Sequence, residues 1–327
     1  MASSPFLLKI EEAFAVKGKV VIVTGAAGLI GSGIAEAFAA NGAKVVCSDR
    51  AGRRLDTVVQ RLRDQSAQAI AVPADFGKPE ELRSLVDAAV QQYGGLDALI
   101  NCGGIPNSGC FADETAEDFD RLYHANVRSL WLLSKHAVAP MTQRGGGAIV
   151  NIASINGHRA TMFCSLYAGT KAAVLATTRE MAVELAPQNI RVNSVSPGAI
   201  SDPSWRFQGL LEQLAEPFRS EIVREFGYLA DVAPSTGAQP LAIGGTKFDV
   251  AMACLYLCTP AARFITGTDL LIDGGKLQEM PQVEPRLGPK PPMAWAALRP
   301  RLQQLPEEAW TSERPRWAKL PKPQPAT

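Results

Sequence analysis

The sequence lacks any long apolar run. None of its 327 residues lies in a stretch that approaches the roughly twenty apolar residues needed to span a membrane. It also lacks an excess of charge, since 33 basic residues face 32 acidic ones and the basic residues are scattered. The N-terminus has neither the basic nor the continuous apolar segment of a secretory signal. We therefore expect no membrane span and no nucleic-acid partner.

Cysteine pairs are absent as well. The six cysteines are dispersed without a Cys-x-x-Cys pair, which argues against a disulfide framework and against structural zinc. Cys254 and Cys258 share the face of an expected helix, but no other ligand cluster accompanies them. We interpret them as core thiols and expect a reduced, cytoplasmic chain without a bound metal.

A glycine-rich turn follows an apolar, β-branched run at residues 19–24, which is typical of a buried strand. The turn contains Gly25, Gly28 and Gly31, and the Ala-rich stretch 32–40 after it has the composition of a helix. Glycines let the backbone approach a pyrophosphate closely, and a helix N-terminus offers unpaired N–H groups to it. The strand, turn and helix together predict a dinucleotide-binding site.

The next expected strand, residues 44–48, ends at Asp49. A carboxylate at this position can accept hydrogen bonds from ribose hydroxyls, and it would repel a 2′-phosphate. Arg50 and Arg53 nearby could instead pair with such a phosphate. The carboxylate at the strand end favours NAD(H) over NADP(H).

Strand patterns recur at residues 69–73, 96–100, 147–152 and 190–195, and segments of helical pattern separate them. This alternation predicts a parallel sheet covered by helices on both faces. In such sheets the ligand crevice lies beyond the carboxyl ends of the strands, where Asp49, Asn101, Ser154 and Pro197 would all fall.

Tyr167 and Lys171 lie four residues apart, about one helical turn, so both project from one helix face. A cation close to a phenol favours the phenolate and lowers the pKa of the tyrosine. Tyr167 is thus a candidate proton-transfer group, and the hydroxyl of Ser154, thirteen residues upstream, is a candidate donor to a substrate oxygen.

With these motifs the chain resembles a classical short-chain dehydrogenase/reductase from about Gly18 to Gly275. The resemblance implies an α/β fold, a Rossmann-type doubly wound parallel sheet, in a single domain. It implies a catalytic tetrad of Ser154, Tyr167, Lys171 and Asn126, the last from His-Ala-Asn-Val. It also implies NAD(H) contacts at residues in the glycine motif, the strand ends and the tetrad: Gly25, Gly28, Leu29, Ile30, Gly31, Asp49, Arg50, Asp75, Phe76, Asn101, Gly103, Tyr167, Lys171, Pro197, Gly198 and Ile200.

Two positions depart from the family pattern. Leu29 stands where the classical motif has glycine, and the Gly28 and Gly31 spacing fits the extended subfamily. The threonine that usually follows Pro-Gly and binds the nicotinamide carboxamide is absent; Ser201 could donate in its place, or Asp202 could accept. The tetrad and the closing Asp-Gly-Gly at residues 273–275 favour the classical subfamily.

The stretch from about 200 to 246 is rich in bulky apolar residues and resembles the family's substrate lid, which predicts a small, partly hydrophobic substrate. Trp205 and Phe207 in this stretch are candidate substrate contacts, and so are Cys164 and His158 before Tyr167. A local core, a subunit contact or a solvated loop histidine are the alternatives.

Residues 276–327 extend beyond the family pattern as a proline-rich C-terminal segment that holds three of the five tryptophans. So many tryptophans favour an ordered tail, packed on its own body or on a neighbouring subunit. The sequence thus predicts a lead-in at 1–17, a main domain at 18–275 and this extension. Members of the family are commonly homo-oligomers, so we expect a tetramer or a dimer.

The predicted activity is NAD-dependent interconversion of a secondary alcohol and a ketone. A sugar or polyol dehydrogenase is the alternative within the family. The Gly28 and Gly31 spacing leaves open an extended-type epimerase or dehydratase, in which NAD is regenerated in each cycle. A non-catalytic NAD(H)-binding sensor or scaffold is the third class, and the complete tetrad argues against it.

Overall fold

The computed structural model describes residues 9–50, 52–106, 109–161, 163–201, 210–211, 213–227, 239–278, 301–302 and 304–311. The chain divides into two compact units. The first, called the body here, comprises Met1–Ile200 and Gly237–Glu279, and the second comprises Ser201–Thr236 and Met280–Thr327. Residues 201–236 therefore group with the C-terminal residues, whereas the sequence assigns them to the main domain.

The body is built on one parallel sheet of seven strands in the order β3-β2-β1-β4-β5-β6-β7. The strands are β1 (Val20–Thr24), β2 (Lys44–Ser48), β3 (Ala69–Ala71), β4 (Ala98–Asn101), β5 (Gly147–Ile152), β6 (Ile190–Pro197) and β7 (Asp269–Ile272). The order reverses between β1 and β4, which is the switch point of a doubly wound sheet. The predicted fold class is confirmed.

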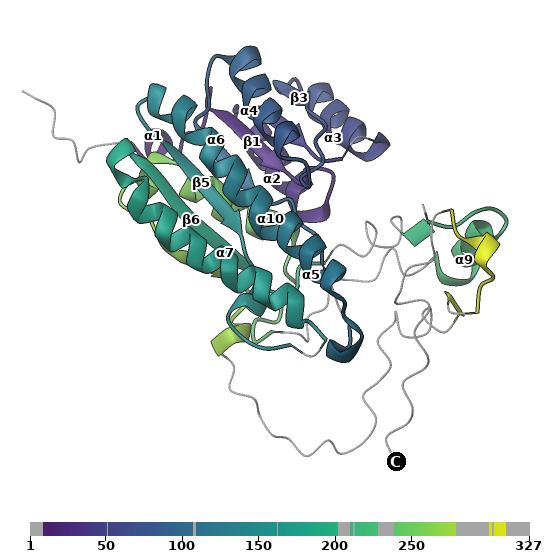
Figure 1. Ribbon diagram of the computed structural model, residues 1–327. Helices are drawn as coiled ribbons and strands as arrows, with labels where there is room; N and C mark the ends of the chain where they lie inside the picture. Colours follow the sequence, from purple (N-terminus) through teal and green to yellow (C-terminus); the bar gives the residue numbers. More distant parts are fainter. Residues whose placement is uncertain are drawn as a thin grey trace, which may run out of the picture. The chain divides into compact units, whose positions relative to one another are not determined.

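Helices cover both faces of this sheet (Figure 1). The described α-helices of the body are α1 (Ile10–Ala13), α2 (Leu29–Ala40), α3 (Arg53–Asp64), α4 (Pro79–Tyr93), α5 (Ala116–Tyr123), α6 (Ser129–Gln143), α7 (Ser165–Glu184) and α10 (Lys247–Leu257). Successive side chains of a strand point to opposite faces. In β1, Val21 and Val23 accordingly pack with α2, α3 and α10, while Val20 and Ile22 pack with α4, α6 and α7.

The second unit has a small apolar core of its own. Helix α9 (Phe218–Phe226) and the residues before it contribute one half, and residues 302–310 contribute the other. Leu214 and Trp310 form an antiparallel bridge, and Arg301 forms ion pairs with Glu221 and Glu225 of α9. Part of the C-terminal extension is thus ordered by packing against the segment before and within α9.

No helix in the described ranges combines the length and the apolar character that crossing a bilayer requires. The described residues also contain no group of three His, Cys, Asp or Glu side chains arranged to hold a metal ion.

Candidate active site at the carboxyl edge of the sheet

The glycine-rich turn joins β1 to α2 with very little space for side chains. Gly25 has φ +66°, in the left-handed region, and a Cβ there would lie 2.9 Å from the Cα of Gly103. A Cβ on Gly31 would lie 2.1 Å from the carbonyl oxygen of Gly25. Only glycine fits at these two positions, so the turn keeps its backbone exposed for a close ligand approach.

Helix α2 begins at Leu29 without a side-chain cap. Its N-cap is Gly28, and its first turn, which includes Leu29 and Ile30, contains no acidic residue. The first N–H groups of a twelve-residue helix are therefore left for a ligand, and the helix dipole favours an anion there. This geometry fits a pyrophosphate.

Asp49 lies directly after β2 and turns toward the glycine-rich turn. Its Oδ2 accepts a hydrogen bond from the backbone N–H of Ala27 at 3.1 Å, and its Oδ1 accepts one from the N–H of Arg50 at 2.8 Å. A carboxylate has about four acceptor positions, so further capacity remains for ribose hydroxyls. The side chain of Arg50 is exposed.

Thr24 and Phe76 shape the segment that follows β4. The Thr24 hydroxyl accepts hydrogen bonds from the N–H groups of Cys102 at 3.0 Å and Gly103 at 2.9 Å. A Cβ on Gly103 would lie 2.4 Å from the Phe76 ring, so that ring packs on the glycine. Asp75 is exposed and accepts from the N–H of Gly77 at 2.9 Å.

The side chain of Asn101 forms hydrogen bonds within the core of the fold. Its side chain is buried, and Nδ2 donates to Asn151 Oδ1 at 2.9 Å and to Ser134 Oγ at 3.1 Å. Asn151 in turn donates to Thr178 of α7 at 2.9 Å. The Nδ2 group of Asn101 is therefore engaged between strands and helices, and its contact with a cofactor stays a prediction.

Asn126 lies in a single π-helical turn, His124–Arg128, between α5 and α6. Such turns often occur at functional sites because they redirect one side chain. Asn126 is buried; its Oδ1 accepts from the N–H of Ile105 at 2.8 Å, and its Nδ2 donates to Ile105 O at 3.0 Å and to Thr170 Oγ1 at 3.1 Å. The bond to Thr170 links it to the helix that carries Lys171.

Ser154, Tyr167 and Lys171 are brought together as the sequence predicts. Ser154 follows β5, and its hydroxyl lies near the phenol of Tyr167 on α7 and acts to lower the pKa of that phenol. The Lys171 Nζ lies 5.6 Å from the centre of the Tyr167 ring and donates to Ile152 O at 2.7 Å. A phenol, a hydroxyl and an ammonium thus meet at the carboxyl end of β5.

Burial dominates the electrostatics of this group. It lowers the pKa of Lys171 from 10.5 to about 8, because the charged ammonium loses hydration. Burial also raises the pKa of Tyr167, and the neighbouring Ser154 hydroxyl only partly opposes that effect. The net direction for Tyr167 is opposite to the one predicted from its spacing to Lys171, since spacing carries no information about desolvation.

The segment expected beside the nicotinamide is held between β6 and β7. The N–H of Gly198 donates to Ile272 O at 2.9 Å, and a Cβ on Gly198 would lie 2.9 Å from the Cα of Asp273. Pro197 ends β6, and Ile200 pairs with Gly245. Asp202, Trp205 and Phe207 lie outside the described residues.

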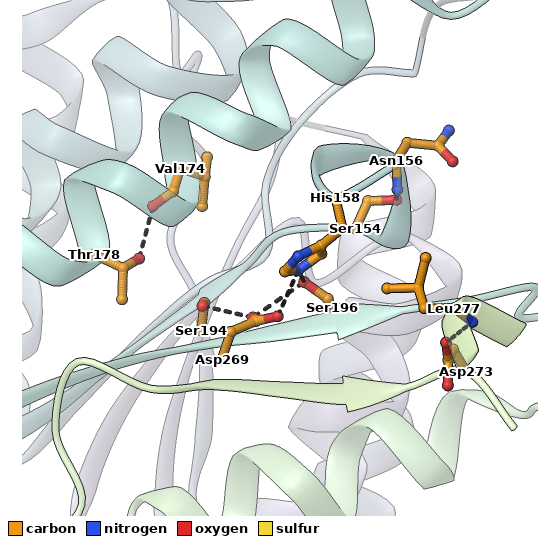
Figure 2. A network of polar contacts seen from close by, with 10 residues as sticks. All are labelled: Ser154, Asn156, His158, Val174, Thr178, Ser194, Ser196, Asp269, Asp273 and Leu277. Atoms are coloured by element: carbon orange, nitrogen blue, oxygen red, sulfur yellow. Dashed lines mark hydrogen bonds and ion pairs between the residues drawn. The ribbon is translucent and has the colours of Figure 1, made fainter. Parts of the chain in front are cut away.

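Of the candidate substrate contacts, Cys164 lines a pocket of about 410 Å³ with mostly apolar walls. The pocket is bounded by residues 109–111, 160, 161, 163–165 and 168, and two of them, Ser165 and Ala168, flank Tyr167 in α7. His158 instead turns toward the sheet, where its Nε2 lies 2.8 Å from Asp269 Oδ2 (Figure 2).

Thr170 and Asp269 take part in these contacts, and sequence reasoning missed both. Thr170 is fully buried and binds Asn126, but a threonine inside a helix carries no distinctive signal. Asp269 opens β7 more than a hundred residues after His158, so only the folded chain brings the two together.

Comparison with known proteins agrees with this geometry. Residues 25–276 match the family described as enoyl-(acyl carrier protein) reductase. The chain is also 35% identical over 263 residues to 7alpha-hydroxysteroid dehydrogenase of Escherichia coli K12, with 80% of this chain and 96% of that protein covered. The chain belongs to the classical short-chain dehydrogenase/reductase family.

One further relative and one solved structure show a similar extent of similarity. The 3-alpha-(or 20-beta)-hydroxysteroid dehydrogenase of Mycobacterium bovis is 37% identical over 242 residues, which cover 72% of this chain and 91% of that protein. A solved structure of 7 alpha-hydroxysteroid dehydrogenase complexed with NADH and 7-oxo glycochenodeoxycholic acid has a TM-score of 0.71 and 33% identity. That alignment covers 83% of this chain and 99% of that one, so about a sixth of this chain has no counterpart there.

Proposed function

We propose that the protein is an NAD(H)-dependent oxidoreductase that interconverts a secondary alcohol and a ketone on a small, partly hydrophobic substrate. The observation that carries this proposal is the meeting of Ser154, Tyr167 and Lys171 at the sheet edge that also carries the glycine-rich turn. In doubly wound sheets this edge is where ligands bind.

NAD(H) fits the residues on the dinucleotide side of the site. The glycine-rich turn and the uncapped start of α2 would hold the pyrophosphate, and Asp49 would accept from the ribose hydroxyls. Asp75 and Phe76 would border the adenine, while Asn101, Gly103, Pro197, Gly198 and Ile200 would line the path to the nicotinamide. The carboxylate of Asp49 supports NAD(H) over its 2′-phosphorylated form.

Each polar group of the tetrad has a distinct role in this proposal. When bound, the nicotinamide accepts or supplies the hydride. Ser154 donates a hydrogen bond to the substrate oxygen, and Tyr167 moves the proton to or from that oxygen. Lys171 places a positive charge near the phenol, and Asn126 fixes the adjoining turn through Ile105 and Thr170.

The raised pKa of Tyr167 bears on the direction of the reaction. At neutral pH the phenol keeps its proton, which suits donation to a ketone oxygen and hence reduction. Oxidation of the alcohol requires the phenolate, so its rate should rise with pH above neutrality while the rate of reduction falls.

The pocket lined by Ser165 and Ala168 of α7 supports a hydrophobic substrate. Its walls are mostly apolar, and Phe111 and Phe163 at its border are 80% and 58% exposed. Two relatives act on hydroxysteroids by name, which agrees with such walls. We therefore place alicyclic secondary alcohols, including ring hydroxyls of steroids, ahead of sugars and polyols.

A homo-oligomer, dimer or tetramer, belongs to the same proposal. Trp131 on α6 and Val183 on α7 are 47% and 76% exposed, which is typical of helices that pack against another subunit. Sedimentation equilibrium at several concentrations would test it, and a purely monomeric distribution would rule it out.

The test of the activity is NADH formation from NAD⁺ across aromatic, alicyclic, steroid and polyol secondary alcohols, with Tyr167→Phe in parallel. We expect turnover with at least one alicyclic alcohol and a loss of roughly 10²–10⁴-fold in the variant. NADH binding, measured by fluorescence, should be equal in both proteins. Binding without turnover across the whole panel would favour the sensor or the epimerase.

A further inference from the structure

A partly exposed polar network joins the turn that carries Ser154 to strands β6 and β7. The turn is a short 3₁₀ helix, Ile155–Gly157, and His158 ends it. His158 Nε2 lies 2.8 Å from Asp269 Oδ2 and 3.3 Å from the hydroxyl of Ser196 (Figure 2). Because a carboxylate only accepts hydrogen bonds, the ring nitrogen is the donor to Asp269.

Both carboxylate oxygens of Asp269 accept hydrogen bonds. Its Oδ1 accepts from the hydroxyls of Ser194 at 2.6 Å and Ser196 at 3.0 Å, while Oδ2 faces His158. Its side chain is only 17% exposed. Ser196 immediately precedes Pro197 and Gly198, the segment that we place beside the nicotinamide. One carboxylate therefore connects the serine turn to that segment.

The turn is held at its other side by Ser154 and by α7. The Ser154 hydroxyl accepts from the N–H of Asn156 at 3.2 Å. A Cβ on Gly157 would lie 2.9 Å from the backbone carbon of Lys171, so the turn rests on the helix that carries Tyr167 and Lys171. With His158 tied to Asp269, the turn is fixed to the helix on one side and to the sheet on the other.

We propose that His158 and Asp269 are positioning residues, which set the place of the Ser154 hydroxyl relative to the segment at Pro197 and Gly198. This inference rests on the proposed function, because in it the network fixes the distance between the substrate oxygen and the nicotinamide ring that exchanges the hydride. His158 acts through the turn and contacts neither reactant. Small displacements of reacting groups lower the rate of a chemical step strongly without weakening cofactor binding.

The first test compares His158→Ala and His158→Gln with the wild-type protein. We expect kcat for alcohol oxidation to fall about tenfold or more in His158→Ala, with the Kd for NADH changed less than about threefold. Glutamine retains an N–H donor and should restore most of kcat. The isotope effect on kcat with alcohol deuterated at the carbinol carbon should rise in His158→Ala, since hydride transfer becomes slower.

A matched control is available at the opposite end of the strands. Arg144 forms an ion pair with Asp97 at 2.9 Å, and the two side chains are 37% and 14% exposed, close to the 32% and 17% of His158 and Asp269. Arg144→Ala should leave kcat and its isotope effect within twofold of wild type. An equal loss of kcat in both alanine variants, or an unchanged isotope effect in His158→Ala, would overturn the inference.

A measurement that needs no substrate separates this inference from the proposed function. Hydrogen exchange of the Asn156, Gly157 and His158 amides should accelerate in His158→Ala and remain unchanged in Arg144→Ala. Unchanged exchange at these amides overturns the inference even if the enzyme is active. Accelerated exchange in a protein that oxidises no alcohol would contradict the proposed function while leaving the structural link intact.

Discussion

The body and the second unit are ordered by different kinds of sequence information. In the body, short motifs such as Thr24-Gly25 and Tyr167 with Lys171 specify local geometry, and the parallel sheet brings their ends together. In the second unit, the core forms between α9 with its preceding residues and residues 302–310, about eighty positions later. The candidate active site at the edge of the sheet can therefore be predicted from motifs a few residues long. The core of the second unit cannot, because it forms between segments that are far apart in the sequence.

The family match includes α9 of the second unit but not the C-terminal residues that pack against it. The Escherichia coli enzyme is covered over 96% of its length, yet it accounts for only 80% of this chain, and the family match ends at residue 276. Residues 301–311, which complete the second core, lie beyond that limit. They are an addition to the part of the chain that the family shares.

The largest expected change is a loss of stability in the second unit, with the body unaffected. Trp310 is buried in its core, and Trp310→Ala should remove about 3–5 kcal/mol from that unit. Amide exchange in α9 should accelerate, while the Kd for NADH should stay within twofold of wild type. Val223→Ala is the control, because Val223 lies on the same helix and is 44% exposed. Slow exchange in α9 of the Trp310 variant would show that the two segments fold independently.

The next prediction concerns NADH binding by the glycine-rich turn of the body. In Gly31→Ala the new Cβ meets the Gly25 carbonyl at 2.1 Å, and the displaced turn should cost about 3 kcal/mol. NADH binding should weaken by roughly 100-fold in a fluorescence titration. Gly227→Ala is the control, since a Cβ there would meet only Val223 Cγ1, at 3.9 Å. Wild-type NADH affinity in Gly31→Ala would contradict the assignment of the turn.

Lys171→Met should have opposite effects on the stability of the body and on its activity. The difference between a pKa of 10.5 and about 8 corresponds to roughly 3 kcal/mol of destabilisation at neutral pH. The lost bond to Ile152 O offsets about 1 kcal/mol of that. The free energy of unfolding of the variant should therefore be about 2 kcal/mol higher than that of the wild type at pH 7, although turnover is lost.

This stabilisation has a defined pH dependence. Between about pH 8 and 10.5 the unfolded lysine binds a proton that the folded one has released, so wild-type stability rises with pH. The advantage of Lys171→Met in denaturant unfolding should accordingly shrink across this window. A gap that stays constant from pH 7 to 10 would show that the ammonium is not destabilised by burial.

The smallest expected effect concerns cofactor choice. Asp49→Ser removes the carboxylate that would repel a 2′-phosphate, and the preference for NAD⁺ over NADP⁺ should fall roughly tenfold in kcat/KM. Asp56→Ser, which removes an exposed carboxylate from the first turn of α3, serves as the control. An unchanged ratio for Asp49→Ser would mean that the adjoining arginines decide the preference.

Sequence reasoning recovered the strands, the glycine-rich turn and the meeting of Ser154 with Tyr167 and Lys171, because each depends on spacing or apolar periodicity. It missed the direction of the Tyr167 pKa shift, since burial is a property of the assembled fold. It also missed the bond of His158 to Asp269, which joins positions 111 residues apart. The predicted domain limits and site roles stay predictions, and the variants above test them.

The central claim is that hydride moves between an alcohol carbon and nicotinamide while Tyr167 moves the proton. The most direct measurement uses cyclohexanol, 1-phenylethanol and a 7-hydroxy bile acid, each deuterated at the carbinol carbon, with NAD⁺. We predict that mass spectrometry finds deuterium in the NADH formed from at least one of them by the wild type and none formed by Tyr167→Phe. Product without deuterium in the cofactor, or equal transfer by both proteins, would contradict the claim.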